Sequence, residues 1–315
     1  MSRFHALISI VFMAALLLGP VAAPCKTFED VLGRKISLAT DPMRIIPLAA
    51  NLTEILYYLE LEDRIVGVTD YSNYPAAALE KPRVGPYVNL NVEKIISLSP
   101  ELVIGTRDGN NSGDVELLEQ AGIQVFIVNP RSVESVISTV AQIGMICGIS
   151  AKAEAMAAEL TRRFESVQAA IQFQKKPLVF LQINCVPIMT VNKTTLHNDL
   201  IRLAGGVNMT ADEPITYPRI SVEEVIRREP EVIIISSMER GGRFEKAKQG
   251  WMQWTSLPAV KNKRVYLIDS DLIDRPSPRI IDGLEAMARI LHSELDWENR
   301  SSREKSHSST KNAVQ

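Results

Sequence analysis

The sequence predicts an α/β protein in which two similar lobes, each built on a central parallel sheet, are joined by one long, rigid α-helix. Three observations lead to this prediction. Short apolar runs alternate with helical segments, one segment recurs in both halves of the chain, and a long helical stretch without glycine or proline lies between the halves. A length of 315 residues suits about two domains.

Buried parallel strands are expected where short β-branched runs lack polar alternation, because such runs suit a sheet covered by helices on both faces. These runs are 44–48, 64–69, 102–105 and 124–128 in the first half, and 178–183, 231–236 and 264–268 in the second. Repeated strand and helix units of this kind favour parallel sheets.

The recurring segment indicates an internal duplication. Residues 91–104 (NVEKIISLSPELVI) align without gaps on residues 221–234 (SVEEVIRREPEVII). Each copy begins with a residue typical of a helix N-cap, Asn91 or Ser221, continues as a short helix to a proline, and enters an apolar strand. Two lobes of similar construction follow from this match.

The helix between the lobes is predicted over 150–173, with Ser150 as its N-cap. Its apolar stripe consists of Ala153, Met156, Ala157, Leu160, Phe164, Val167 and Ile171. At a rise of about 1.5 Å per residue the helix would exceed about 30 Å, enough to cross between lobes. We therefore expect lobes at 24–149 and 174–298, held on a stiff connection with a ligand cleft between them.

The two ends of the chain are expected to lie outside the folded body. Residues 1–23 read as a secretory signal peptide, because the apolar run 6–18 is shorter than the roughly 20 residues a spanning helix needs and small residues follow it. Cys25 leaves a lipid-anchored N-terminus open, and an uncleaved anchor is a further alternative. Residues 299–315 are polar and predict a disordered tail.

Composition excludes several functions. With 35 Lys and Arg against 37 Asp and Glu, the formal charge of −2 lacks the basic field of nucleic-acid binders. The four histidines, His5, His197, His292 and His307, are scattered, so no bare metal site is expected. Hydrolase, metalloprotease and nucleotide-binding motifs do not occur, so we expect no enzyme, and a secreted enzyme is the alternative of another class.

Several segments, in their order and spacing, resemble a known family. They are 30–36 (DVLGRKI), 44–56 (RIIPLAANLTEIL), 64–75 (RIVGVTDYSNYP), the two repeated segments and 271–281 (DLIDRPSPRII). Over about 27–295 the chain resembles the periplasmic substrate-binding proteins of ABC importers for cobalamin and iron-siderophore complexes.

The resemblance, which is closest to the cobalamin-binding members, implies two Rossmann-like lobes on a helical backbone and a periplasmic location. It also implies an ABC permease dimer with ATPase subunits as partner and a large metal chelate as transported ligand. That ligand would be cobalamin or another corrinoid, with a ferric siderophore or haem as the alternative. No resident cofactor is implied.

The resemblance also implies the ligand site. It places Tyr71, Tyr87, Met189, Tyr217, Asp271 and Arg275 at cleft positions. A flat macrocycle is held by stacking and apolar contact, with a few polar groups fixing its orientation. Prolines beside the tyrosines would order their loops. The alternative is that these tyrosines only pack as half-buried anchors.

Glu93 and Glu223 occupy the same position in the two repeated segments, two residues after each N-cap. In the resembled family a glutamate on each lobe docks against arginines of the permease subunits, which implies this role for both residues. Ser221 and Glu224 fit a capping box, which would leave Glu223 free. The alternative is that each glutamate only complements the dipole of its own helix.

Overall fold

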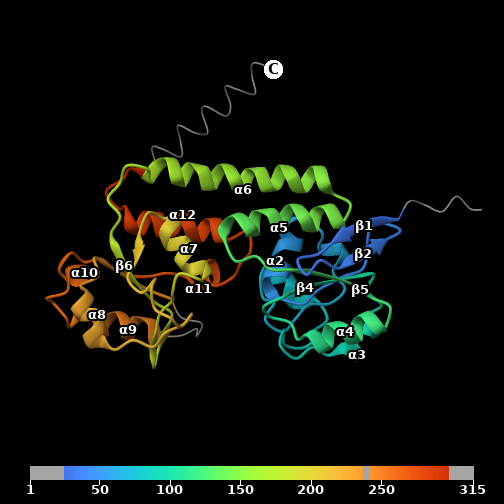
Figure 1. Cartoon of the computed structure of the whole chain (residues 1–315), viewed down its shortest axis with the longest axis horizontal. Coiled ribbons are helices and arrows are strands. Elements are labelled where there is room, and N and C mark those ends of the chain that lie inside the picture. Colours follow the sequence, from blue (N-terminus) through green and yellow to red (C-terminus); the bar gives the residue numbers. More distant parts are fainter. Residues whose placement is uncertain (1–24, 237–241, 298–315) are drawn as a thin grey trace, which may run out of the picture.

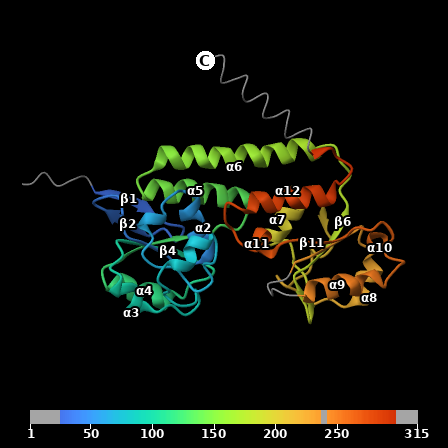
Figure 2. The same ribbon diagram turned by 180° about the vertical axis from the view of Figure 1, so that it is seen from behind.

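The computed structural model describes residues 25–236 and 242–297. The predicted signal peptide 1–23 and tail 299–315 lie outside the described residues. The predicted fold class is confirmed: two α/β lobes lie side by side beneath a layer of long helices (Figures 1 and 2). Within the described ranges no helix is long and apolar enough to cross a membrane.

The N-lobe, as we call residues 25–149, contains a three-stranded parallel sheet in the order β3-β4-β5. Its strands are β3 (Ile45–Pro47), β4 (Leu102–Thr106) and β5 (Gln124–Val128), with an antiparallel hairpin of β1 (Lys26–Glu29) and β2 (Lys35–Leu38). Its helices are α2 (Ala50–Tyr58), α3 (Val92–Ser97), α4 (Ser112–Gln120) and α5 (Val133–Ile146), with 3₁₀ turns η1 (Glu62–Arg64) and η2 (Ala76–Glu80).

The C-lobe, residues 174–297, contains a parallel sheet in the order β11-β10-β6-β9. Its strands are β6 (Leu178–Gln182), β9 (Val207–Asn208), β10 (Val232–Ile235) and β11 (Val265–Leu267), with an antiparallel hairpin of β7 (Asn184–Cys185) and β8 (Ile188–Met189). Its helices are α7 (Leu196–Leu203), α8 (Val222–Arg228), α9 (Arg243–Met252), α10 (Pro258–Lys261), α11 (Ser270–Ile273) and α12 (Ile280–Leu291).

One predicted strand, 64–69, is wrong. The segment makes only isolated bridges, at Ile65 to Ile45 and at Val68 to Arg83. The Val66 N–H bonds to the Ile45 carbonyl, but Val68 already bonds to the segment around Arg83. Because the chain changes its partner within a few residues, no continuous ladder forms.

The connecting helix is α6 (Ser150–Ile171), which crosses above both lobes and packs along α5 and α12 (Figures 1 and 2). Its apolar stripe lies in a core cluster that includes residues of both lobes. The predicted cap is wrong, since the N-cap is Ile149 and Ser150 is already helical. The Ile149 N–H reaches back to the Gly144 carbonyl, so the tight turn from α5 begins the helix one residue earlier.

The duplication is visible in the backbone. α3 and α8 begin at Asn91 and Ser221, whose side chains accept a backbone N–H three residues on, at 2.9 and 3.2 Å. Both helices end just before a proline at a left-handed residue, Ser99 with φ 46° and Glu229 with φ 49°. The two copies of the repeated segment therefore share the same cap and the same termination.

A buried carboxylate joins the two lobes. Glu54 of α2, with 2% of its side chain exposed, accepts hydrogen bonds from three residues of the C-lobe. These are Arg275 Nη1 at 2.8 Å, Ser277 Oγ at 2.6 Å, and Arg279 Nε and Nη2 at 2.9 and 2.8 Å. Burial lowers the pKa of Arg279, but the hydrogen bonds and charge of Glu54 outweigh it and hold that pKa above its usual value. The carboxylate and guanidinium groups therefore compensate one another across the junction.

Replacing Glu54 by alanine should destabilise the fold strongly, because it leaves two partly buried guanidinium groups without their anion. We expect a loss of about 3–5 kcal/mol in the free energy of unfolding. The control is Glu60→Ala, whose carboxylate pairs with Lys152 but is 67% exposed, with an expected loss of no more than about 1 kcal/mol. Urea denaturation at neutral pH measures both, and equal losses would contradict the role of Glu54.

Candidate functional site

On the N-lobe, two of the predicted ligand residues form an aromatic pair. The rings of Tyr71 and Tyr87 meet edge to face, with centroids 6.3 Å apart, and remain 60% and 40% exposed. Tyr87 lies over Gly109, where an added Cβ would come within 3.1 Å of the ring. The Asn110 side chain donates to the Tyr87 carbonyl at 2.9 Å. The loop after β4 therefore fixes the position of this pair.

On the C-lobe, the predicted residues Met189 and Tyr217 lie on two paired extended segments. Met189 forms an antiparallel bridge with Arg219. The Thr190 N–H bonds to the Pro218 carbonyl at 3.0 Å, and a second bond of the same length joins Asn192 N–H to the Thr216 carbonyl. Tyr217 is thereby held on both sides by backbone bonds while 47% of it stays exposed.

Charges of both lobes act on the hydroxyl of Tyr217. Burial raises the pKa of its hydroxyl, and the negative charges of Asp274 and Asp108 raise it further. Asp108 belongs to the N-lobe loop after β4, where it pairs with Arg131 at 2.6 Å. This is the same loop that supports Tyr87, so Tyr217 lies within electrostatic range of the loop after β4.

Arg275, predicted to bind ligand, is largely engaged by protein groups. Its Nη1 donates to Glu54 and to the Asn73 side chain, both at 2.8 Å, and its Nη2 lies 3.4 Å from the Asp271 carboxylate. Asn73 lies in the loop of Tyr71. Arg275 therefore holds that loop against the C-lobe, and the predicted ligand roles of Arg275 and Asp271 stay predictions.

The ion pair between Glu54 and Arg279 was not predicted from the sequence. The Arg279 guanidinium lies 3.8 Å from the centre of the Tyr74 ring, beside its bonds to Glu54. A signal was present, because Glu54 is the single charged residue of an otherwise apolar or neutral helix. A charge in such a place needs a paired partner.

The predicted docking residues Glu93 and Glu223 are both exposed and stand in the first turns of α3 and α8. The pKa of Glu223 is lowered by hydrogen bonds from its own backbone and from Ser221, so Glu223 is ionised at neutral pH. In each lobe a tyrosine precedes the predicted docking glutamate by six residues, Tyr87 before Glu93 and Tyr217 before Glu223. The duplication thus includes the exposed ring as well as the helix.

The predicted capping box at α8 is only half formed. Ser221 accepts the Glu224 N–H, but the Glu224 carboxylate turns to Arg227 at 2.6 and 2.8 Å and to Arg228 at 2.5 Å. Those two arginines lower the pKa of Glu224 to about 2. Glu224 is therefore engaged by Arg227 and Arg228, which leaves Glu223 as the exposed carboxylate of this turn.

The two histidines of the described ranges have protein partners. His197 Nε2 lies 2.7 Å from Asp274, and His292 Nε2 lies 3.0 Å from the Ala204 carbonyl. Among residues 25–236 and 242–297 no group of three or more His, Cys, Asp or Glu side chains could hold a metal ion.

A separate pocket of about 450 Å³ lies in the C-lobe between the β7–β8 hairpin and α9, beside Trp251 and Trp254. Ile188, which lines it, packs into the core cluster of Trp251, whereas Met189 packs against the cluster that includes α6. Successive strand residues point to opposite faces. The pocket and Met189 therefore lie on opposite sides of the hairpin.

Comparisons with known proteins identify the family. The sequence model described as "Periplasmic binding protein" matches residues 45–272. The chain belongs to this periplasmic binding protein family. It is 31% identical over 252 residues to a vitamin B12-binding protein of Vibrio parahaemolyticus, covering 79% of this chain and 90% of that one. Membership confirms the predicted resemblance and implies a binding protein located in the periplasm.

Solved structures agree with this assignment. The periplasmic vitamin B12-binding protein of Vibrio cholerae matches with a TM-score of 0.69 and 30% identity, over 80% of this chain and 97% of that one. A periplasmic heme-binding protein of Pseudomonas aeruginosa matches with a TM-score of 0.68 and 25% identity, over 80% and 93%.

The placement of Tyr217 can be tested by alkaline titration of tyrosinate absorbance. The step removed by Tyr217→Phe should titrate above about pH 10, the ordinary pKa of tyrosine. Asp108→Asn should lower that pKa, because it removes a negative charge that opposes the phenolate. Asp212→Asn is the control, since this carboxylate is 94% exposed and pairs with Lys193. Equal midpoints in Asp108→Asn and the wild type would show that Tyr217 does not lie within electrostatic range of Asp108.

Proposed function

We propose that this protein is the substrate-binding component of an ABC importer and binds cobalamin or a related corrinoid between its lobes. The observation that carries the proposal is the set of exposed aromatic rings, Tyr71 and Tyr87 on the N-lobe and Tyr217 on the C-lobe. The names of the Vibrio relatives support the same ligand. The protein delivers this ligand to a permease and performs no chemistry itself.

The side chains suit a flat, partly apolar macrocycle. Tyr71, Tyr87 and Tyr217 stay substantially exposed although each loop is fixed by hydrogen bonds or ring contacts. Rigid rings of this kind bind large flat ligands at low entropic cost, and the Met189 thioether can adapt to an irregular surface. A corrinoid brings its metal already enclosed in a macrocycle, so it needs no cluster of protein ligands.

Haem is the second candidate, favoured by a specific observation. Tyrosine and methionine both serve as axial ligands of haem iron. This chain has exposed tyrosines on both lobes, and its Met189 is only partly buried. The likeness to the heme-binding protein of Pseudomonas aeruginosa points the same way. A ferric siderophore remains the third ligand for comparison.

Delivery depends on docking both lobes at once. Glu93 and Glu223 are exposed carboxylates at equivalent positions, and arginine pairs with a carboxylate through two parallel hydrogen bonds. Two such carboxylates suit a two-fold symmetric permease dimer with its ATPase subunits. Because α6 packs on α5 and α12, the lobes should move little on their own. We infer that the permease separates them.

Export by a signal peptide ending near residue 23 is part of the proposal. Cys25, the first described residue, is exposed and has a free thiol. Mass spectrometry of the mature N-terminus distinguishes a cleaved soluble chain from one acylated at Cys25.

Titration of the purified protein with cyanocobalamin, haemin and a ferric siderophore tests the ligand. We expect the tightest binding for cyanocobalamin, and about ten- to a hundredfold weaker binding in Tyr87→Ala and in Tyr217→Ala, since each change removes a large apolar contact. Phe173→Ala is the control because this ring, just beyond α6, is 89% exposed. Tight binding of haemin alone would move the assignment to haem, and hydrolysis of a test ester without binding would reject a receptor.

Joint replacement of Glu93 and Glu223 by alanine tests docking. Ligand affinity should be unchanged, because both carboxylates are exposed in the first turns of α3 and α8 and are assigned to the permease, while uptake into cells should be lost. Glu134→Ala with Glu165→Ala is the matched control, since Glu134 of α5 and Glu165 of α6 are also exposed glutamates on helices. A collapse of affinity in the Glu93 and Glu223 variant would show that these residues bind the ligand instead.

A further inference from the structure

Each lobe carries its exposed ring and its docking carboxylate on one short segment of chain. Tyr87 and Tyr217 each lie four residues before the N-cap of the docking helix, and the glutamate follows in the first turn. The two features are therefore close enough in the chain for a shift of the helix to reach the ring. How firmly they are linked depends on what holds the ring loop to the helix.

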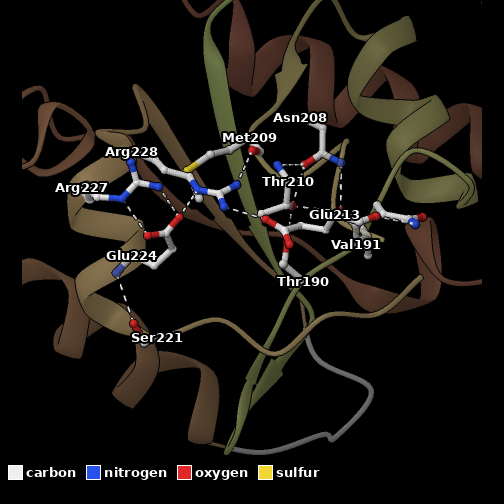
Figure 3. Close-up of polar contacts among 11 residues, drawn as sticks. Thr190, Val191, Asn208, Met209, Thr210, Glu213, Ser221, Glu224, Arg227 and Arg228 are labelled. Atoms are coloured by element: carbon white, nitrogen blue, oxygen red, sulfur yellow. Dashed lines mark hydrogen bonds and ion pairs between the residues drawn. The ribbon is translucent and has the colours of Figure 1, made fainter. Parts of the chain in front are cut away.

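In the C-lobe an arginine makes this link (Figure 3). Arg228, at the last turn of α8, donates Nη1 to the Met209 carbonyl at 3.0 Å and Nη2 to the Glu213 carboxylate at 2.6 Å. Its Nε bonds to Glu224 of the same helix at 2.5 Å. Only about a quarter of the Arg228 side chain is exposed, at 26%, so these bonds are sheltered from water.

Glu213 continues the link to the ring. Its backbone carbonyl accepts a hydrogen bond from the Asn192 side chain at 3.1 Å, and the Asn192 N–H bonds to the Thr216 carbonyl next to Tyr217. The start of the loop is anchored separately, because Thr210 is fully buried and bonds to Thr190 and Asn208 (Figure 3). The segment 211–217 is thus held by the lobe at its base and by Arg228 at Glu213.

A gap beneath the docking helix α8 leaves room for the helix and the loop to shift. A pocket of about 240 Å³ lies between α8 and the loop, lined by Glu213, Pro218, Ser221 and Arg228 among others. Where side chains are not closely packed, a neighbour can shift without a steric clash. Across this gap the connection between helix and loop is polar and directional.

The N-lobe differs at the corresponding position. In the alignment of the repeated segments Leu98 takes the place of Arg228 and Lys94 that of Glu224. Leu98 packs against the apolar core of the N-lobe and makes no ion pair with the loop of Tyr87. The polar link is therefore a property of the C-lobe copy of the duplicated unit.

We propose that Arg228 and Glu213 are positioning residues that hold the Tyr217 loop and couple it to the docking helix α8. When a permease cation pairs with Glu223, the displacement of α8 is carried through Arg228 to Glu213, and Tyr217 loosens its contact with the ligand. Docking on the C-lobe thereby weakens ligand binding. The inference rests on the proposed function, because it requires both a ligand between the lobes and a permease.

The experiment measures the dissociation constant of cyanocobalamin with and without the permease in nanodiscs. Five proteins are compared: the wild type, Arg228→Gln, Arg228→Lys, Glu213→Gln and Arg227→Gln. Arg227 is a matched control because it lies on the same helix and pairs with the same Glu224, but its side chain is 69% exposed and its bonds stay within α8.

In the wild type the permease should raise the dissociation constant by a factor within the usual range of coupling, about 5- to 150-fold. Arg227→Gln should retain this factor. Arg228→Gln and Glu213→Gln should reduce it to about one, and Arg228→Lys should restore part of it. A purely structural role would weaken binding equally with and without the permease, so the ratio distinguishes the two.

Two results overturn the inference: no effect of the permease on the wild type, or the same factor in Arg228→Gln as in Arg227→Gln. Urea denaturation of each variant identifies any that fails to fold, and Glu213→Gln then tests the link from its other end. Failure of the proposed function gives a different result, because the wild type would then bind none of cyanocobalamin, haemin and ferric siderophore before any permease is added.

Discussion

The buried carboxylate of Glu54 is the interaction on which the arrangement of the two lobes depends. It is a buried anion on an otherwise apolar or neutral helix. Arg275 and Arg279 from the other lobe compensate its charge, and Ser277 donates a further hydrogen bond. Through Arg275 and Asn73 the same network holds the loop of Tyr71, so it also orders one side of the proposed ligand site. A buried charge of this kind is costly when unpaired, which makes the junction specific for one relative position of the lobes.

Patterns local in sequence allowed much of the fold to be predicted. The apolar stripe of α6, the N-caps Asn91 and Ser221 and most parallel strands follow from periodicity and propensity, because each depends on neighbouring residues. The strand expected at 64–69 failed because partner choice is not local: its ends bond to different segments. The same limit hid the pairing of Glu54 with Arg279, which are 225 residues apart.

For the site, residue types could be predicted, but their partners could not. Tyr71, Tyr87 and Tyr217 are exposed on the described structure, and both glutamates proposed for docking lie in the first turns of their helices. Arg275 was predicted to bind the ligand, yet its guanidinium group is largely engaged by Glu54, Asn73 and Asp271. Only three-dimensional contacts show whether a charge is available to a ligand or already serves the fold.

The central claim is that a junction fixed by Glu54 presents rings from both lobes to one macrocycle. A crystal structure of the protein with cyanocobalamin tests it most directly. We predict the corrin between Tyr87 and Tyr217, with the bonds of Glu54 to Arg275 and Arg279 intact. A corrinoid seated instead in the C-lobe pocket beside Trp251, or a junction whose Glu54 has lost its arginines, would contradict the account.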